Sequence, residues 1–111
     1  MNIVEKIGMP AALGQLAEEA AELAQAALKM QRILMGTNPT PVTPEEAKSN
    51  LIEEAVDVDL CLTVLGYEDP DIHYSRDLYE EKRERWEKRI TEAQTVCDED
   101  GCRIVYPEVK K

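Results

Sequence analysis

The chain has little aromatic surface: its 111 residues include one Trp, four Tyr and no Phe. A hydrophobic core must therefore be built from aliphatic side chains and methionine. Alanine, glutamate and leucine are abundant, which favours helix over sheet. This length is enough for one domain with a single core, so we expect a small helical protein.

Long apolar runs, cysteine and surplus basic charge are also lacking. No segment approaches the ~20 apolar residues of a membrane helix, and the N-terminus lacks the apolar stretch of a signal peptide. Three cysteines make a disulfide framework improbable, so a reducing, cytoplasmic location is expected. A formal net charge of −10 argues against a general nucleic-acid binder. We therefore expect no membrane and no nucleic-acid partner.

Apolar residues recur every three or four positions along residues 10–35, which predicts a long helix. Pro10 suits its first turn, and Gly36 suits its C-terminal end. Its expected core stripe consists of Leu13, Leu16, Ala20, Leu23, Ala27, Met30 and Leu34. A stripe of this kind predicts packing against other helices.

Two further long helices are predicted after a proline-rich loop at residues 36–44. This loop is interpreted either as a lid over a site or as a plain connector. Thr43 suits the N-cap of the second helix, which we expect to end near Leu65 because a glycine follows. The third helix is expected at about residues 71–94, and a short additional helix at residues 2–7.

The C-terminal segment differs in character from the helices before it. Residues 98–101 are typical of a turn, and strand-forming residues follow, which predicts a small hairpin or a loose extension. Cys97 and Cys102 flank this turn, and whether they pair stays open. We expect an all-α helical bundle over residues 1–94 with a C-terminal extension over residues 95–111.

The first and second helices each carry two carboxylates three residues apart. In ideal helix geometry, Glu19 and Glu22 lie about 60° and 120° to one side of the apolar stripe. Glu54 and Asp57 lie at the same offsets, on the same side, of the second helix. Each pair should border a packing seam, and antiparallel packing would bring the two pairs face to face.

Such a carboxylate group predicts a metal site. Four neighbouring carboxylates repel one another unless a cation neutralises them, and Mg²⁺ or Mn²⁺ suits oxygen ligands in this number. His73 is the only histidine, so zinc hydrolysis has little support. Glutamate doublets can instead form solvated faces, but Glu54 and Asp57 lie in an otherwise apolar helix. Glu18 and Glu53 point further from the seam and are candidate catalytic bases or outer ligands, with a solvated role as the alternative.

The two acidic segments resemble a known family signature. Glu18-Glu19-Ala20-Ala21-Glu22 and Glu54-Ala55-Val56-Asp57 are similar to the EExxE…ExxD motif of the MazG-like all-α nucleoside triphosphate pyrophosphohydrolases. The resemblance implies hydrolysis of a nucleoside triphosphate to the monophosphate and pyrophosphate. It also implies a homodimer or homotetramer, and Mg²⁺ held by Glu19, Glu22, Glu54 and Asp57.

The family usually carries basic residues on the helix after the second motif, where they hold phosphate oxygens. By resemblance, the candidate substrate-binding residues are Lys82, Arg85 and Arg89, and more weakly Gln15. The alternative for the basic residues is a solvated face with helical glutamate partners. The chain departs from the family in a longer interval between the motifs and in Trp86, where some members carry Asn.

Two other functions remain open at this point. Phosphoribosyl-ATP pyrophosphohydrolase shares the fold and the motif, and turnover of phosphoribosyl-ATP in preference to dNTPs would identify it. A non-catalytic helical interaction protein would use the acidic pairs as surface or oligomer contacts. In that case metal would not change its stability, and Glu54→Gln would be harmless or stabilising.

Overall fold

The computed structural model describes residues 1–36, 38–72 and 75–105, except for the side chains at positions 94 and 95. This part of the chain forms four helices and one two-stranded antiparallel sheet, so the predicted mostly helical fold is confirmed. The chain divides into two compact units, Met1–Tyr74 and Ser75–Lys111. The expected boundary after residue 94 stays a prediction, and His73 lies outside the described residues.

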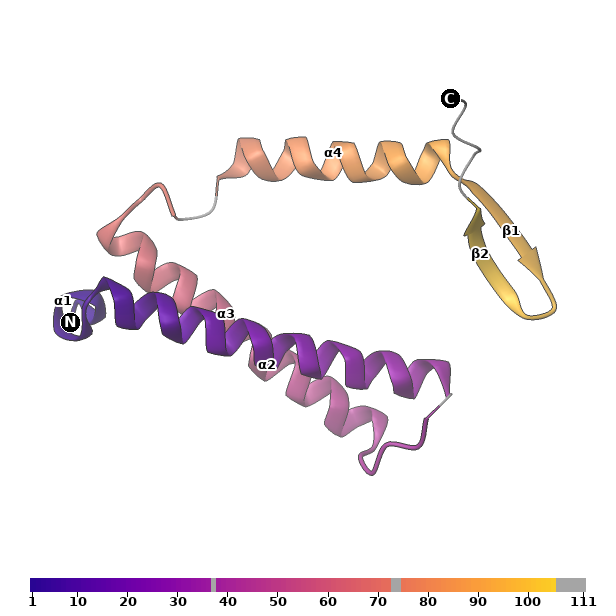
Figure 1. The fold of residues 1–111 in the computed structure, drawn as a ribbon, viewed down its shortest axis with the longest axis horizontal. Coiled ribbons are helices and arrows are strands. Elements are labelled where there is room, and N and C mark those ends of the chain that lie inside the picture. The colour runs from indigo at the N-terminus through magenta and orange to yellow at the C-terminus, as the bar shows by residue number, and fades with distance from the viewer. Residues whose placement is uncertain (37, 73–74, 106–111) are drawn as a thin grey trace. The chain divides into compact units, whose positions relative to one another are not determined.

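The first unit is a pair of long helices preceded by a short one. α1 (Ile3–Ile7) leads into α2 (Met9–Met35), and α3 (Pro44–Glu68) runs back antiparallel alongside α2 (Figure 1). Gly8 joins α1 to α2 with φ = 89°, a conformation that favours glycine because other residues have a Cβ. This antiparallel pair is the arrangement required to bring the two acidic segments together.

The ends of α2 and α3 follow the predicted capping residues, with one exception. Gly36 ends α2 in a left-handed conformation, with φ = 64°. The Thr43 hydroxyl accepts a hydrogen bond of 3.1 Å from the backbone N–H of Glu46, which confirms Thr43 as the N-cap of α3. The predicted end near Leu65 is wrong: α3 continues to Glu68, because the glycine at 66 has no positive φ and stays helical.

The core of the first unit lies where α1 meets the other two helices. Val4, Ala12 and Leu65 are buried there, with exposed fractions of 4%, 4% and 0%. Met9, Leu16 and Val64 pack against them. The short N-terminal helix therefore closes one end of the α2–α3 pair, which the sequence analysis did not specify.

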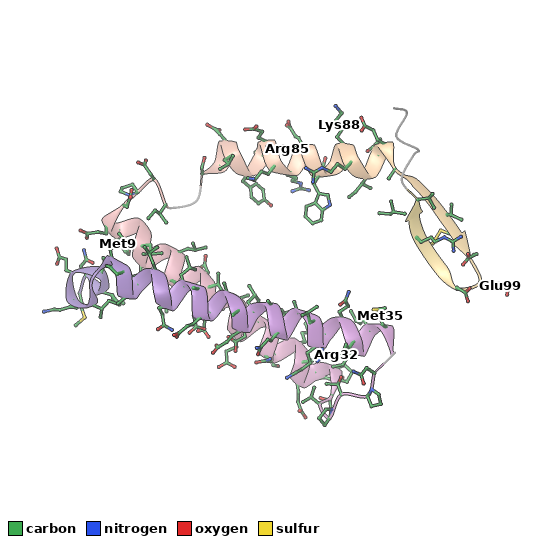
Figure 2. All side chains as sticks on the ribbon, viewed as in Figure 1. Met9, Arg32, Met35, Arg85, Lys88 and Glu99 are labelled. Carbon is green, nitrogen blue, oxygen red and sulfur yellow. A yellow bond between two sulfur atoms is a disulfide. The ribbon has the colours of Figure 1, made fainter. Side chains whose placement is uncertain are left out.

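The second unit consists of α4 (Arg76–Glu92) followed by β1 (Gln94–Asp98) and β2 (Gly101–Val105). The predicted third helix begins later than expected, because the Ser75 side chain caps it by accepting from the backbone N–H of Leu78 at 3.3 Å. β1 and β2 form the predicted hairpin, and Cys97 lies opposite Cys102. A disulfide joins these two cysteines (Figure 2).

Among the described residues, no helix combines the length and the apolar character needed to cross a membrane.

Candidate metal centre

The packed faces of α2 and α3 are centred on the acidic motifs. On α2, Glu19 lies seven residues from each of the buried alanines Ala12 and Ala26, so all three share one face. On α3, Glu54 lies within about 20° of the buried Ala47 and Leu65 in ideal helix geometry. Glu19 and Glu54 thus lie within the α2–α3 seam.

This placement corrects the expectation for Glu19 and Glu54, which were expected to border the seam and lie within it instead. The packed face of α2 is rotated by about 60° toward Glu19 from the predicted stripe centre at Leu16. Of the predicted stripe, Leu16, Leu23 and Met30 are half-buried, whereas Leu13, Ala20, Ala27 and Leu34 are exposed. The smaller alanine side chains at 12 and 26 occupy the contact and allow α3 to approach closely.

Three of the four predicted metal ligands converge. Glu19, Glu22 and Glu54 each offer a carboxylate oxygen, and these oxygens lie within 4.8 Å of one another. Glu19 and Glu54 are half-buried, and Glu22 is exposed. Asp57, the fourth predicted ligand, is half-buried and close enough to Glu19 to raise the pKa of that carboxyl group. α2 and α3 therefore gather acidic side chains from both motifs at one place.

Glu19 has the most distinctive environment of the group. Burial raises its pKa above the ordinary value of 4.5, and the negative charges of Glu22 and Asp57 raise it further. The side-chain amide of Gln15 opposes this effect, because its Nε2 donates a 2.8 Å hydrogen bond to Oε1 of Glu19. Gln15, expected to contact the nucleotide, here orients a carboxylate.

Two buried carboxylate oxygens of this group lack a hydrogen-bond donor among the described residues. Oε2 of Glu19 and Oε2 of Glu54 are buried, and neither accepts a hydrogen bond from a donor among the described residues, whereas a proton on Glu19 would be shared with Glu22. A buried carboxylate oxygen without a partner is costly, and a proton or a cation removes the cost. The donor set contains oxygen atoms only, and hard divalent cations such as Mg²⁺ prefer oxygen. The residues present therefore fit the predicted cation.

The candidate catalytic glutamates lie outside this group. Glu18 and Glu53 are exposed, each one residue before a ligand candidate that lies in the seam. Neither belongs to the set of oxygens within 4.8 Å. Their catalytic assignment stays a prediction, and the solvated alternative matches their exposure.

The predicted phosphate-binding residues lie on α4, in the second unit. Arg85 forms a 3.4 Å ion pair with Glu81, as the solvated alternative requires. Arg85, labelled in Figure 2, lies on α4, and no residue of this helix is buried. Lys82 lies beside Trp86 and Ile90 along one side of the helix. Substrate binding by Lys82, Arg85 and Arg89 stays a prediction.

Cys61 is a residue near the site that the sequence analysis did not single out. Burial raises the pKa of its thiol, and the nearby charges of Glu19 and Asp57 raise it further. Cys61 follows Asp57 by four residues and Glu54 by seven, a spacing that places all three on one side of α3. This spacing could have identified Cys61 from the sequence as a neighbour of the carboxylate group.

Comparison of the chain with protein-family models, with curated proteins and with solved structures finds no match.

Proposed function

We propose that the chain is a Mg²⁺-dependent nucleoside triphosphate pyrophosphohydrolase, which converts a nucleoside triphosphate to the monophosphate and pyrophosphate. One observation carries the proposal: Glu19 and Glu54, from separate helices, each hold a buried carboxylate oxygen that has no hydrogen-bond donor among the described residues, and both lie beside Glu22. Packing does not account for two such oxygens in a helix seam. The motif resemblance supplies the reaction.

Some side chains of the protein would hold the cation, and one orients a side chain that holds it. Glu19, Glu22 and Glu54 would hold the cation, with Asp57 adding negative charge nearby. Gln15 fixes Oε1 of Glu19 and leaves the buried Oε2 without a hydrogen-bond donor among the described residues. When bound, Mg²⁺ would neutralise phosphate charge and lower the pKa of a water. This would allow so acidic a chain to bind a polyanion.

The proposal includes the homodimer or homotetramer that the resemblance implies. Ile52 and Val56 lie one turn apart on α3, away from the seam, and they are 55% and 60% exposed within the described residues. Neighbouring exposed apolar side chains of this kind are typical of a protein interface. Analytical ultracentrifugation would give the oligomeric state, and Val56→Asp should lower it.

The function is tested by product analysis. The full chain is incubated with dNTPs, NTPs and phosphoribosyl-ATP, with Mg²⁺ or with EDTA, and the products are separated. We expect monophosphate and pyrophosphate, lost with EDTA and in Glu54→Gln. Glu45→Gln is the matched control, because Glu45 is exposed in the first turn of α3 and lies outside the carboxylate group.

Other products would identify a different function. Diphosphate with inorganic phosphate would mean that a different bond is cleaved. Preferential turnover of phosphoribosyl-ATP would identify the related hydrolase of histidine synthesis. No turnover, together with an unchanged melting temperature on adding Mg²⁺, would favour the non-catalytic interaction protein.

A further inference from the structure

A small cavity lies beside the carboxylate group in the first unit. Its volume is about 140 Å³, and residues of α1, α2 and α3 line it. Most of the lining is aliphatic, from Ile3, Ile7, Leu60 and Val64, and its polar members are Gln15 and Cys61. No charged side chain is among the described residues that line it. The cavity therefore suits an uncharged, largely apolar group.

Two lining residues connect the cavity to the candidate metal centre. Gln15 lines the cavity and also donates its 2.8 Å hydrogen bond to Glu19. Cys61 lines the cavity and is close enough to Glu19 and Asp57 for their charges to act on its thiol. A molecule whose anionic end is held at the carboxylate group would therefore have its other end beside this cavity.

We propose that the cavity receives the base of the nucleotide, while its phosphates lie at the carboxylate group. This inference rests on the proposed function, because it assigns a second part of the same substrate. A nucleobase is a flat, uncharged ring whose faces are apolar, and it has the character that the lining requires. The phosphates, by contrast, need the cation-binding end.

The lining also sets the kind of selectivity. The Gln15 amide N–H₂ is already bonded to Glu19, so few polar groups remain to read the hydrogen-bonding edge of a base. A pocket of this kind distinguishes ligands by size and apolar area, and it discriminates weakly between polar edges. Bases of equal size should differ in affinity by less than roughly 10-fold, whereas removal of the base should weaken binding by more than roughly 10-fold.

Cys61 provides a direct readout of cavity occupancy. It is a free thiol, and Cys97 and Cys102 are joined in a disulfide, so alkylation under non-reducing conditions reports on Cys61. The full chain is treated with a small maleimide at mildly alkaline pH, and the Cys61 peptide is quantified by mass spectrometry. The probes are the α,β-imido analogue of dTTP with Mg²⁺, and inorganic tripolyphosphate with Mg²⁺.

Relative to Mg²⁺ alone, which neutralises the charges that raise the pKa of the Cys61 thiol, we expect the dTTP analogue to slow alkylation of Cys61 by more than roughly 10-fold, and tripolyphosphate to leave it nearly unchanged. Equal protection by the two probes, or protection by neither, would overturn the inference. Product analysis with hydrolysable dTTP then decides the proposed function separately. A loss of reactivity that increases with protein concentration, without ligand, would show that a second copy of the chain covers the cavity, which also overturns it.

Ile7→Ser provides a second test that does not depend on thiol reactivity. Ile7 is 51% exposed, so the substitution should leave the helices intact, and Leu34→Ser, at a 75% exposed position outside the cavity, is the control. Calorimetry should show binding of the dTTP analogue weakened by about 10-fold in Ile7→Ser, with tripolyphosphate binding unchanged. Equal weakening for both ligands, or unchanged binding of the analogue, would contradict the base assignment.

Discussion

An oxygen of Glu19 on α2 and an oxygen of Glu54 on α3 lie within 4.8 Å of each other. In both glutamates, Oε2 is buried and has no hydrogen-bond partner among the described residues. Their motifs are separated by the whole proline-rich loop, yet antiparallel packing places both in one seam. Two negative charges so close destabilise the fold until they are neutralised. Neutralisation therefore links stability, pH and metal binding at this site.

Magnesium should stabilise the protein, and Glu54→Gln should remove that effect. In EDTA, Glu54→Gln should melt a few degrees higher than the wild type, because one of the repelling carboxylates is gone. Adding Mg²⁺ should then raise the melting temperature of the wild type but not of the variant. Glu45→Gln should respond to Mg²⁺ as the wild type does. A Mg²⁺ response retained in Glu54→Gln would exclude Glu54 as a ligand.

The metal-free protein should lose stability as the pH rises through the titration of Glu19. Burial, Glu22 and Asp57 raise the pKa of Glu19 above 4.5, so the folded state holds this proton more tightly than the unfolded state. The contribution is therefore greatest below pH 4.5 and is lost as pH rises through the higher folded-state pKa. Melting curves in chelator should fall less steeply with pH for Glu19→Gln. Parallel curves for the two proteins would contradict the raised pKa.

Gln15→Ala should weaken Mg²⁺ binding without abolishing it. The amide hydrogen bond holds Glu19 in place and stabilises its charged form. Because Gln15 is exposed, its loss should cost only about 0.5–1 kcal/mol, or a few-fold in affinity by calorimetry. Glu19→Gln should have a much larger effect. Equal losses in the two variants would mean that Gln15 does more than orient Glu19.

Thr43→Ala should destabilise the first unit by about 1 kcal/mol, because the N–H of Glu46 loses its side-chain acceptor. Denaturant unfolding followed by circular dichroism would measure this loss. Thr43→Ser should restore most of the stability, since serine caps helices equally well. Unchanged stability in Thr43→Ala would show that the cap contributes little to holding the α2–α3 pair.

Reduction of the Cys97–Cys102 disulfide should loosen the hairpin and leave α2 and α3 unchanged. An isolated two-stranded hairpin is marginally stable in water, and the disulfide restricts its unfolded ensemble. Amide exchange at residues 96–104 should become faster with reductant and in Cys97→Ser. Exchange within α2 and α3 serves as the internal control. Retained protection in the hairpin would mean that strand pairing and the 2.8 Å Arg103–Asp98 ion pair are sufficient.

Much of the local structure follows from short-range features of the sequence. Capping by Thr43 and Gly36 depends on residues within one helical turn, and the Asp98–Gly101 turn depends on four consecutive residues. The later start of α4 was missed because its cap, Ser75, competes with other polar residues in the preceding segment. Local signals identify that an element exists more reliably than where it begins.

By itself, the sequence determined the helices, the hairpin and the pairing of acidic residues at intervals of three, because these depend on backbone propensity and helical period. Only the tertiary structure decided which face of each helix meets the other. α2 carries a leucine stripe and an adjacent alanine face, and packing selected the face that contains Ala12, Glu19 and Ala26. Periodicity shows which side chains share a face, but contact between helices depends on how closely their backbones approach. That approach, and the closure by α1, placed Glu19 and Glu54 in the seam and formed the cavity beside them.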